Sequence, residues 1–210
     1  MKVLLINGSP KEKGCTYTAL KEIEKTLKED GVDSEIYYIG KDPIAPCRDC
    51  RACAKLGRCV IDDKVNAFVD FAKDFDGYIV GSPVHYASAS GVVVPFLDRA
   101  FFIDSMTKRN SFVLKPASAI VSARRAGTTA TIDQLNKYFQ INQMPVISGR
   151  YWNMVHGANP EEAQKDEEGM QNMRILARNL AYFLKCKELA TKAGLEKPKQ
   201  EVTVYTNFIR

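Results

Sequence analysis

Four cysteines lie close together in the order C-x2-C-x2-C-x5-C: Cys47, Cys50, Cys53 and Cys59. Spacers of two residues let a tight loop turn successive thiolates toward one centre, as in loops that wrap an iron-sulfur cube. Two other interpretations stay open. Zinc sites usually divide four cysteines into two well-separated pairs, and loosely packed free thiols need no metal at all. The spacing therefore favours an iron-sulfur cluster over zinc or free thiols.

A polar loop at residues 8–18, with the sequence GSPKEKGCTYT, has the groups needed to hold a phosphate. It offers hydroxyls, backbone amides and the start of an expected helix, whose partial positive charge stabilises anions. It contains neither G-x-G-x-x-G nor G-x-x-x-x-G-K-[ST], which disfavours a Rossmann dinucleotide site and a P-loop. The alternative is an ordinary helix cap formed by Cys15 to Thr18.

Two later loops suit a flat, anionic ring. Residues 81–91 (GSPVHYASASG) combine a rigid Ser-Pro turn with small residues that let backbone amides approach a planar heterocycle. His85 invites a general-acid role, although a lone loop histidine more often stacks or forms hydrogen bonds. Residues 122–129 (SARRAGTT) bring two guanidinium groups, which could stabilise an anionic reduced ring or attract a phosphorylated partner.

Alternating strand and helix patterns must position these loops. Apolar runs predict strands at 2–7, 35–39, 77–81, 116–122 and 145–147, and amphipathic patterns predict helices at 16–30, 64–73, 92–103 and 131–141. This alternation predicts an α/β fold, a doubly wound five-stranded parallel sheet flanked by helices, with the cysteine-rich loop after strand two. The loops after strands one, three and four should then form one site at the carboxyl edge of the sheet.

The 210 residues, 45% of them hydrophobic, predict a single domain over 1–210 with a carboxyl-terminal extension at 151–210. In that extension we expect an irregular or extended segment at 151–160, one long helix at 161–189 with a methionine and leucine stripe for packing, and an extended, edge-paired segment at 202–205.

The charge composition limits which binding partners the sequence requires. The net charge is +5, but Lys and Arg are dispersed among 25 acidic residues, so nucleic acid is not required and an anionic small molecule fits equally well. We expect neither a signal peptide nor a membrane span. Six cysteines, four of them in one loop, argue against a secreted disulfide scaffold and predict a cytoplasmic protein with metal or redox chemistry.

Taken together, these motifs resemble the flavodoxin-like NAD(P)H-dependent FMN reductases and, with the cysteine loop, the iron-sulfur flavoproteins. The resemblance covers nearly the whole chain. Its parts are the Gly8-Ser9-Pro10 loop, the cysteine motif, residues 81–84 followed by 96–99, residues 123–127 and the terminal residues 206–210. It implies FMN held by the three loops, a [4Fe-4S] cluster held by the four cysteines, and a homodimer or homotetramer.

The resemblance also assigns the cofactor-binding residues. Those that match the phosphate loop are Ser9, Lys11, Cys15, Thr16 and Thr18; those that match the loop lining the isoalloxazine are Pro83, Val84, His85 and Tyr86; those that match the third loop are Ser122, Ala123, Arg124, Arg125 and Gly127. Three positions depart from the family pattern. Lys11 replaces a common Arg, Cys15 replaces a small polar residue, and His85 replaces a Tyr, which puts a protonatable group near the ring edge.

The resemblance implies an FMN-dependent oxidoreductase that passes electrons between the cluster and FMN, linked to NAD(P)H or ferredoxin and to acceptors such as quinones. Three alternatives remain: an FMN or quinone reductase without a cluster, a non-catalytic electron carrier, and a zinc-stabilised binding module with a vestigial flavin site.

Overall fold

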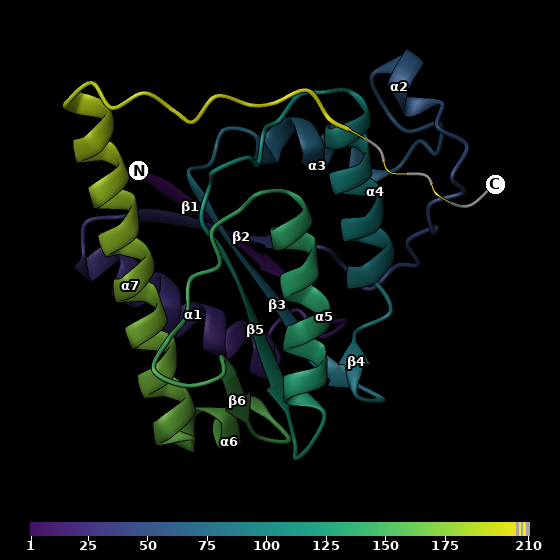
Figure 1. The fold of residues 1–210 in the computed structure, drawn as a ribbon. Coiled ribbons are helices and arrows are strands. Elements are labelled where there is room, and N and C mark those ends of the chain that lie inside the picture. The colour runs from purple at the N-terminus through teal and green to yellow at the C-terminus, as the bar shows by residue number, and fades with distance from the viewer. Residues whose placement is uncertain (205, 207, 209–210) are drawn as a thin grey trace.

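The computed structural model describes residues 1–204, 206 and 208, and its centre is a parallel sheet with the strand order β2-β1-β3-β5-β6 (Figure 1). The strands are β1 (Lys2–Asn7), β2 (Asp33–Tyr38), β3 (Gly77–His85), β5 (Ala117–Ala123) and β6 (Met154–His156). A two-residue strand, β4 (Ser88–Ala89), pairs antiparallel with the end of β3. Strand order reverses between β1 and β3, as in a doubly wound sheet. The predicted fold class is confirmed.

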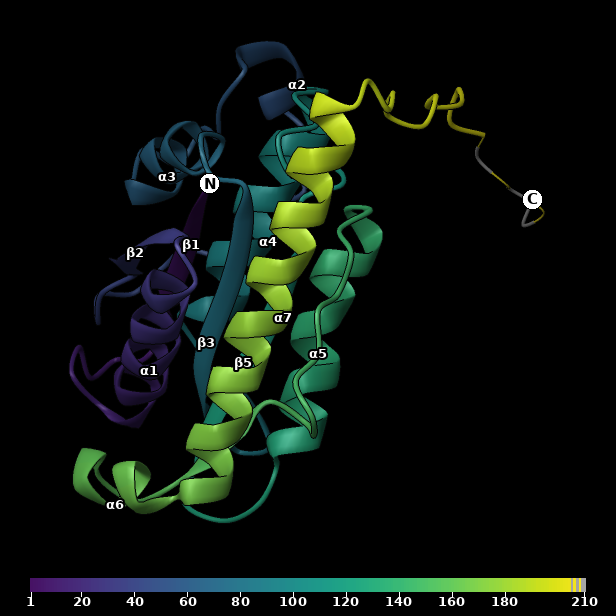
Figure 2. The same ribbon diagram turned by 90° about the vertical axis from the view of Figure 1, so that its left-hand side faces the viewer.

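Helices cover both faces of this sheet. They are α1 (Cys15–Glu29), α2 (Cys53–Leu56), α3 (Lys64–Ala72), α4 (Val93–Met106), α5 (Thr128–Ile141), α6 (Pro160–Lys165) and α7 (Glu167–Lys192). Because successive strand residues point to opposite faces, Val3 and Leu5 pack with α1 and α7, while Leu4 and Ile6 pack with α3, α4 and α5. Figure 2 shows α7 in front of β3 and β5. The two apolar layers fix the strand ends that carry the polar loops.

The fifth strand was predicted at 145–147, and this is wrong. Val146 makes only an isolated bridge to Ala117, and the fifth parallel strand is β6, inside the segment predicted to be irregular. Between the two, the Asn153 side-chain amide takes the place of a backbone donor: it donates to Ala119 O at 3.2 Å and to Ser118 Oγ at 2.9 Å, while Asn153 O accepts from Val121 N at 2.9 Å. A polar side chain thus forms the hydrogen bonds to β5 at a position where the sequence pattern shows no strand.

The long helix predicted at 161–189 is two helices, α6 and α7, separated at Asp166. The Asp166 carboxylate caps α7 by accepting from Gly169 N at 2.9 Å, and it also accepts from His156 N at 2.6 Å. Farther along α7, the Asn172 side chain accepts from the backbone amides of Arg150 and Tyr151. These side chains fasten the start of α7 to β6 and to the loop before it.

The predicted extended segment at 202–205 is not edge-paired as far as the structure describes it: residues 202–204 form no strand and are exposed. Tyr205, and Asn207, Ile209 and Arg210 of the terminal family motif, lie outside the described residues. In the described part of the chain, no helix combines the length and apolar character that crossing a membrane requires.

Candidate functional site

The three predicted loops meet at the carboxyl edge of the sheet. There they surround a hollow of about 290 Å³, called here the edge cavity. Ten of the fourteen residues assigned to the cofactor line it: Ser9, Lys11, Cys15, Thr16, Pro83, Val84, His85, Ser122, Ala123 and Arg124. Segments separated by more than a hundred residues in the chain are therefore brought to one place by the parallel sheet.

The amino terminus of α1 opens into the edge cavity. Its N-cap is Gly14, and no side chain of the described residues caps it, so the amides of the first turn have no cap to satisfy them. The hydroxyls of Thr16 and Ser122 are hydrogen-bonded to each other at 2.8 Å. Ser9 is buried, and its hydroxyl accepts from Lys11 N at 3.1 Å. The alternative of an ordinary cap formed by residues 15–18 is therefore not what the structure contains.

Thr18 is placed differently from the expectation. Its hydroxyl donates to Gly14 O at 3.3 Å, and its side chain lines a larger groove of about 940 Å³ between α1 and α7. The walls of that groove carry charges of both signs, including an ion pair between Arg174 and Glu22. No other residue assigned to the cofactor lines it, so we place the candidate site at the smaller edge cavity.

The second loop is a hairpin formed by the end of β3 and β4. Its tip, Tyr86 and Ala87, has left-handed backbone conformations with φ of 51° and 58°, and Tyr86 is fully exposed. Gln134 of α5 fixes the hairpin, because its side-chain oxygen accepts from Ser88 Oγ at 2.8 Å and from Ala89 N at 3.0 Å. Tyr86 and Arg125 do not line the edge cavity.

Gly127 lies beneath the hairpin tip and also does not line the cavity. It has φ of 91°, and a Cβ there would lie 2.8 Å from Ala87 Cα and 2.8 Å from Val84 Cγ1. Only glycine combines this conformation with this close approach. Gly127 therefore sets the distance between the second and third loops.

A fourth loop, which sequence reasoning missed, completes the edge cavity: Gly157, Ala158, Asn159 and Pro160. It follows β6, so the misplaced fifth strand concealed it. Cys15 contacts this loop, since its thiol donates to Gly157 O at 3.5 Å. Burial raises the pKa of Cys15 above its ordinary value, which keeps the thiol protonated at neutral pH. The sequence signal was a Gly-Ala-Asn-Pro turn directly after a short apolar run.

All four motif cysteines line one small hollow, called here the cysteine pocket, of about 20 Å³. Cys53 begins α2 and is buried, Cys59 is half-buried, and Cys47 and Cys50 are exposed. Burial raises the pKa of Cys53. No three His, Cys, Asp or Glu side chains among the described residues converge on a position for a single metal ion. The cysteines thus surround a pocket rather than one point.

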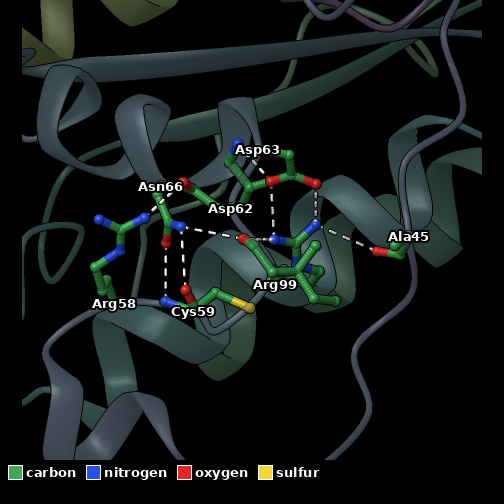
Figure 3. A network of polar contacts seen from close by, with 9 residues as sticks. Ala45, Arg58, Cys59, Asp62, Asp63, Asn66 and Arg99 are labelled. Carbon is green, nitrogen blue, oxygen red and sulfur yellow. Dashed lines mark hydrogen bonds and ion pairs between the residues drawn. The ribbon is translucent and has the colours of Figure 1, made fainter.

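The loop reaches this shape through unusual backbone. Asp49 and Arg51, which flank Cys50, have φ of 48° and 55°. Non-glycine residues in this left-handed region cost free energy, and they persist where surrounding contacts impose them. The other end of the loop is held by Asn66 of α3, which accepts from Cys59 N at 2.8 Å and donates to Cys59 O at 3.1 Å (Figure 3).

Arg99 of α4 forms the inner wall of the cysteine pocket and is 1% exposed. Its guanidinium binds Asp63 through both terminal nitrogens, with Nη2 2.8 Å from Oδ1, and Nη2 also donates to Ile61 O at 3.0 Å (Figure 3). Burial acts to lower the pKa of Arg99, but Asp63 and Cys59 outweigh it and the pKa is raised. The guanidinium therefore stays cationic.

The edge cavity and the cysteine pocket lie at different levels of α4. Ser90, just before this helix, donates to Gly8 O at 2.5 Å and so lies at the carboxyl edge. The pocket-lining residues Arg99 to Ile103 follow Val93 by six to ten positions, or about 9 to 15 Å along the helix. Figure 1 shows α2 beside the end of α4 that lies away from β4.

Comparison with solved structures defines the class of fold. RosB with a bound 8-demethyl-8-formylriboflavin-5'-phosphate intermediate aligns with a TM-score of 0.70 at 13% identity, over 99% of this chain and 92% of that one. A flavodoxin from the domain Archaea aligns with a TM-score of 0.57 at 15% identity, over 88% and 99% of the chains. The fold is therefore flavodoxin-like.

Residues 1–159 match the family described as NADPH-dependent FMN reductase, and the chain belongs to this family. Among curated relatives, an iron-sulfur flavoprotein of Methanocaldococcus jannaschii is 29% identical over 88% of this chain and 98% of its own length. An iron-sulfur flavoprotein of Methanosarcina thermophila is 27% identical over 88% and 95% of the two chains. The resemblance expected from the motifs is confirmed.

Proposed function

We propose that this chain is an iron-sulfur flavoprotein that binds FMN in the edge cavity and a [4Fe-4S] cluster in the cysteine pocket, and that it passes electrons between them. The observation that carries the proposal is the cysteine pocket: four cysteines in a cluster-type spacing line one hollow whose inner wall is a buried cation. The relatives are named iron-sulfur flavoproteins, and these names agree with an iron-sulfur group paired with a flavin.

The residues around the edge cavity fit FMN. The uncapped amides of α1, with Ser9, Lys11 and Thr16, would hold its phosphate. Pro83 to His85 would lie along the isoalloxazine ring. Arg124, exposed at the cavity, would stabilise negative charge on the reduced ring. We assign Gly127 the role of shaping the hairpin, and we propose no direct contact with FMN for Thr18, Tyr86 or Arg125.

The residues around the cysteine pocket fit an anionic cluster. Cys47, Cys50, Cys53 and Cys59 would supply the four thiolates, and the Arg99 side of the pocket is the one shielded from water. Basic side chains, Arg48 and Arg51, belong to the same pocket lining. They favour approach of an acidic electron-carrier protein such as a ferredoxin.

Bound FMN would exchange one or two electrons and the cluster one at a time, so together they would connect one-electron and two-electron partners. The partners we propose are NAD(P)H or a ferredoxin as donor and a quinone or similar small molecule as acceptor. The chain's own part is to bind both groups, to orient them and to keep the inner wall of the cluster dry.

We further propose a homodimer or homotetramer. Within one chain the cysteine pocket is displaced along α4 from the carboxyl edge, and electron transfer slows steeply with distance. A second copy whose cysteine loop reaches the edge cavity would shorten that path.

The test is anaerobic purification followed by an ultraviolet-visible spectrum and analysis of iron, sulfide and flavin. About four irons per chain with one FMN supports the proposal. Flavin without iron after anaerobic reconstitution would contradict the cluster and leave an FMN or quinone reductase. A colourless protein that holds zinc would indicate a binding module. Steady turnover with NAD(P)H and a quinone separates an enzyme from a non-catalytic carrier.

A further inference from the structure

Arg99 has one donor that its structural contacts leave unused. Its Nε is buried and has no hydrogen-bond partner among the described residues. The other two nitrogens are occupied, because Nη1 and Nη2 bind Asp63, Nη2 also binds Ile61 O, and Nη1 lies 3.4 Å from Ala45 O. A buried N–H without a hydrogen-bond partner is costly, so one on a cationic group requires an explanation.

The surroundings of Arg99 show which ligand the unused donor suits. The same side chain lines the cysteine pocket together with all four cysteines and two apolar residues of α4, Phe102 and Ile103. Apolar walls exclude water and strengthen any charge interaction across the pocket. An anionic acceptor in this pocket would satisfy the Nε donor, and the sulfur atoms of a thiolate-bound cluster are such acceptors.

Asp63 fixes the direction of the guanidinium without cancelling its effect. Its carboxylate accepts from Val65 N at 3.1 Å as the N-cap of α3, so its position is set by a helix. The Asp63 side chain is 26% exposed, whereas the Arg99 side chain is 1% exposed. Solvent therefore screens the negative partner more than the positive one, and the positive end of the pair is the one at the cysteine pocket.

We propose that Arg99 sets the reduction potential of the cluster: its Nε–H donates a hydrogen bond to a sulfur atom in the cysteine pocket and stabilises the reduced form. This inference rests on the proposed function. Reduction brings one electron from the external donor into the cluster and increases its negative charge by one. No bond breaks and Arg99 keeps its proton, so its charge favours the reduced state.

The test measures the midpoint potential of the anaerobically loaded protein by a redox titration followed by electron paramagnetic resonance. One variant replaces the ion pair by neutral residues of similar shape, Arg99→Gln with Asp63→Asn, so that no buried carboxylate is left alone. A second, Arg99→Lys, keeps a charge but has no Nε–H. The control is Arg109→Gln, since Arg109 donates to Gly57 O of the same loop at 2.9 Å but does not line the pocket.

We expect the double variant to be about tenfold harder to reduce, a fall of about 59 mV for one electron, with iron content and the control unchanged. An unchanged potential, or an equal fall in Arg109→Gln, would overturn the inference. If the double variant loses its iron, Arg99→Lys decides: it keeps the charge but lacks the Nε–H, so a smaller fall in potential supports the hydrogen bond and an unchanged potential overturns the inference. A wild-type chain that assembles no cluster overturns the proposed function, and this inference with it, whereas an unchanged potential in loaded variants overturns the inference alone.

Discussion

The edge cavity takes its walls from the ends of hydrogen-bonded parallel strands, whereas the cysteine pocket takes them from an irregular loop that packs on α4. In the edge cavity, the position of Ser122 follows from strand register, and Ser9 lies two residues beyond the end of β1. In the cysteine pocket, the positions of Cys50 and Cys59 depend on strained backbone and on side chains such as Asn66. The sheet thus frames the edge cavity, while the cysteine pocket depends on a few anchoring contacts.

The largest effect that separates the two regions is expected from Cys53→Ser. Cys53 is buried at the start of α2, so its loss should remove nearly all iron and sulfide and leave the flavin content unchanged. The measurement is iron, sulfide and FMN per chain after anaerobic reconstitution. Cys186→Ser, at an exposed position of α7, is the matched control and should keep its iron. Full iron in Cys53→Ser would remove it from the ligand set.

A change in the opposite region is Gly127→Ala. The left-handed backbone costs an alanine roughly 1–2 kcal/mol, and the added Cβ would also push against Ala87 and Val84. We expect lower stability and weaker FMN binding with normal iron content, measured by urea unfolding and flavin fluorescence. The control is Gly31→Ala. Gly31 has φ of 74°, and an added Cβ would have nothing within 4 Å, so this variant carries the backbone cost alone. Equal losses in both variants would show that the contact with the hairpin is unimportant.

A smaller effect is expected from Thr16→Val, which leaves the Ser122 hydroxyl without its partner inside the edge cavity. An unsatisfied buried hydroxyl costs about 1–3 kcal/mol, but water in the edge cavity can replace part of the lost hydrogen bond, so the free energy of unfolding of the FMN-free protein should fall by only about 1 kcal/mol. Thr26→Val on the same helix is the control, because Thr26 donates only to the helical carbonyl of Glu22. If the double variant Thr16→Val with Ser122→Ala is no more stable than Thr16→Val alone, the two hydroxyls are not energetically coupled.

The smallest effect is a change of stability with pH, as distinct from the total loss on substitution, at the edge of the cysteine pocket. Burial opposes ionisation of Asp63, but Arg99 and the Val65 amide outweigh it and hold its pKa below the ordinary value. The carboxylate therefore stabilises the fold fully above its unfolded pKa of about 3.9, and that stabilisation is lost as pH falls through the lower folded pKa.

The free energy of unfolding at pH 6 should thus be larger for the wild type than for Asp63→Asn, and this difference should shrink in acid. Chemical denaturation of the cluster-free proteins at several pH values measures the difference. Asp70→Asn, which breaks the more exposed ion pair with Arg109, should show little change with pH. A constant gap for Asp63→Asn down to pH 2 would contradict the assignment.

The two regions also differ in how far the sequence predicts them. Strand ends at Asn7 and Ser122, and the turn after Gly81, were enough to predict that three loops meet, because parallel strands share a carboxyl edge. The fourth loop was missed because the fifth strand, β6, has only three residues and directly follows the polar Asn153, so the sequence shows no apolar run of strand length there. Thr18 lines the groove between α1 and α7 and not the edge cavity, and the loop sequence alone did not separate these two positions.

For the cysteine pocket, spacing predicts the four cysteines but not their inner wall. Arg99 is forty residues beyond Cys59, and only the packing of α4 against the loop brings it there. Its burial, and the free Nε that follows from it, depend on the Asp63 contact, which no local pattern in the sequence reveals.

The side chains that fasten α7 to the last strand have a consequence for association of the folded chains. A strand at the rim of a sheet offers unpaired backbone groups to other molecules and so invites aggregation. Here the outward amide of His156 donates to the Asp166 carboxylate. The amides of Arg150 and Tyr151, in the loop before β6, donate to the Asn172 side chain. This rim is closed to strand addition, so copies of the chain should assemble through helices or loops on this side and not by extending the sheet.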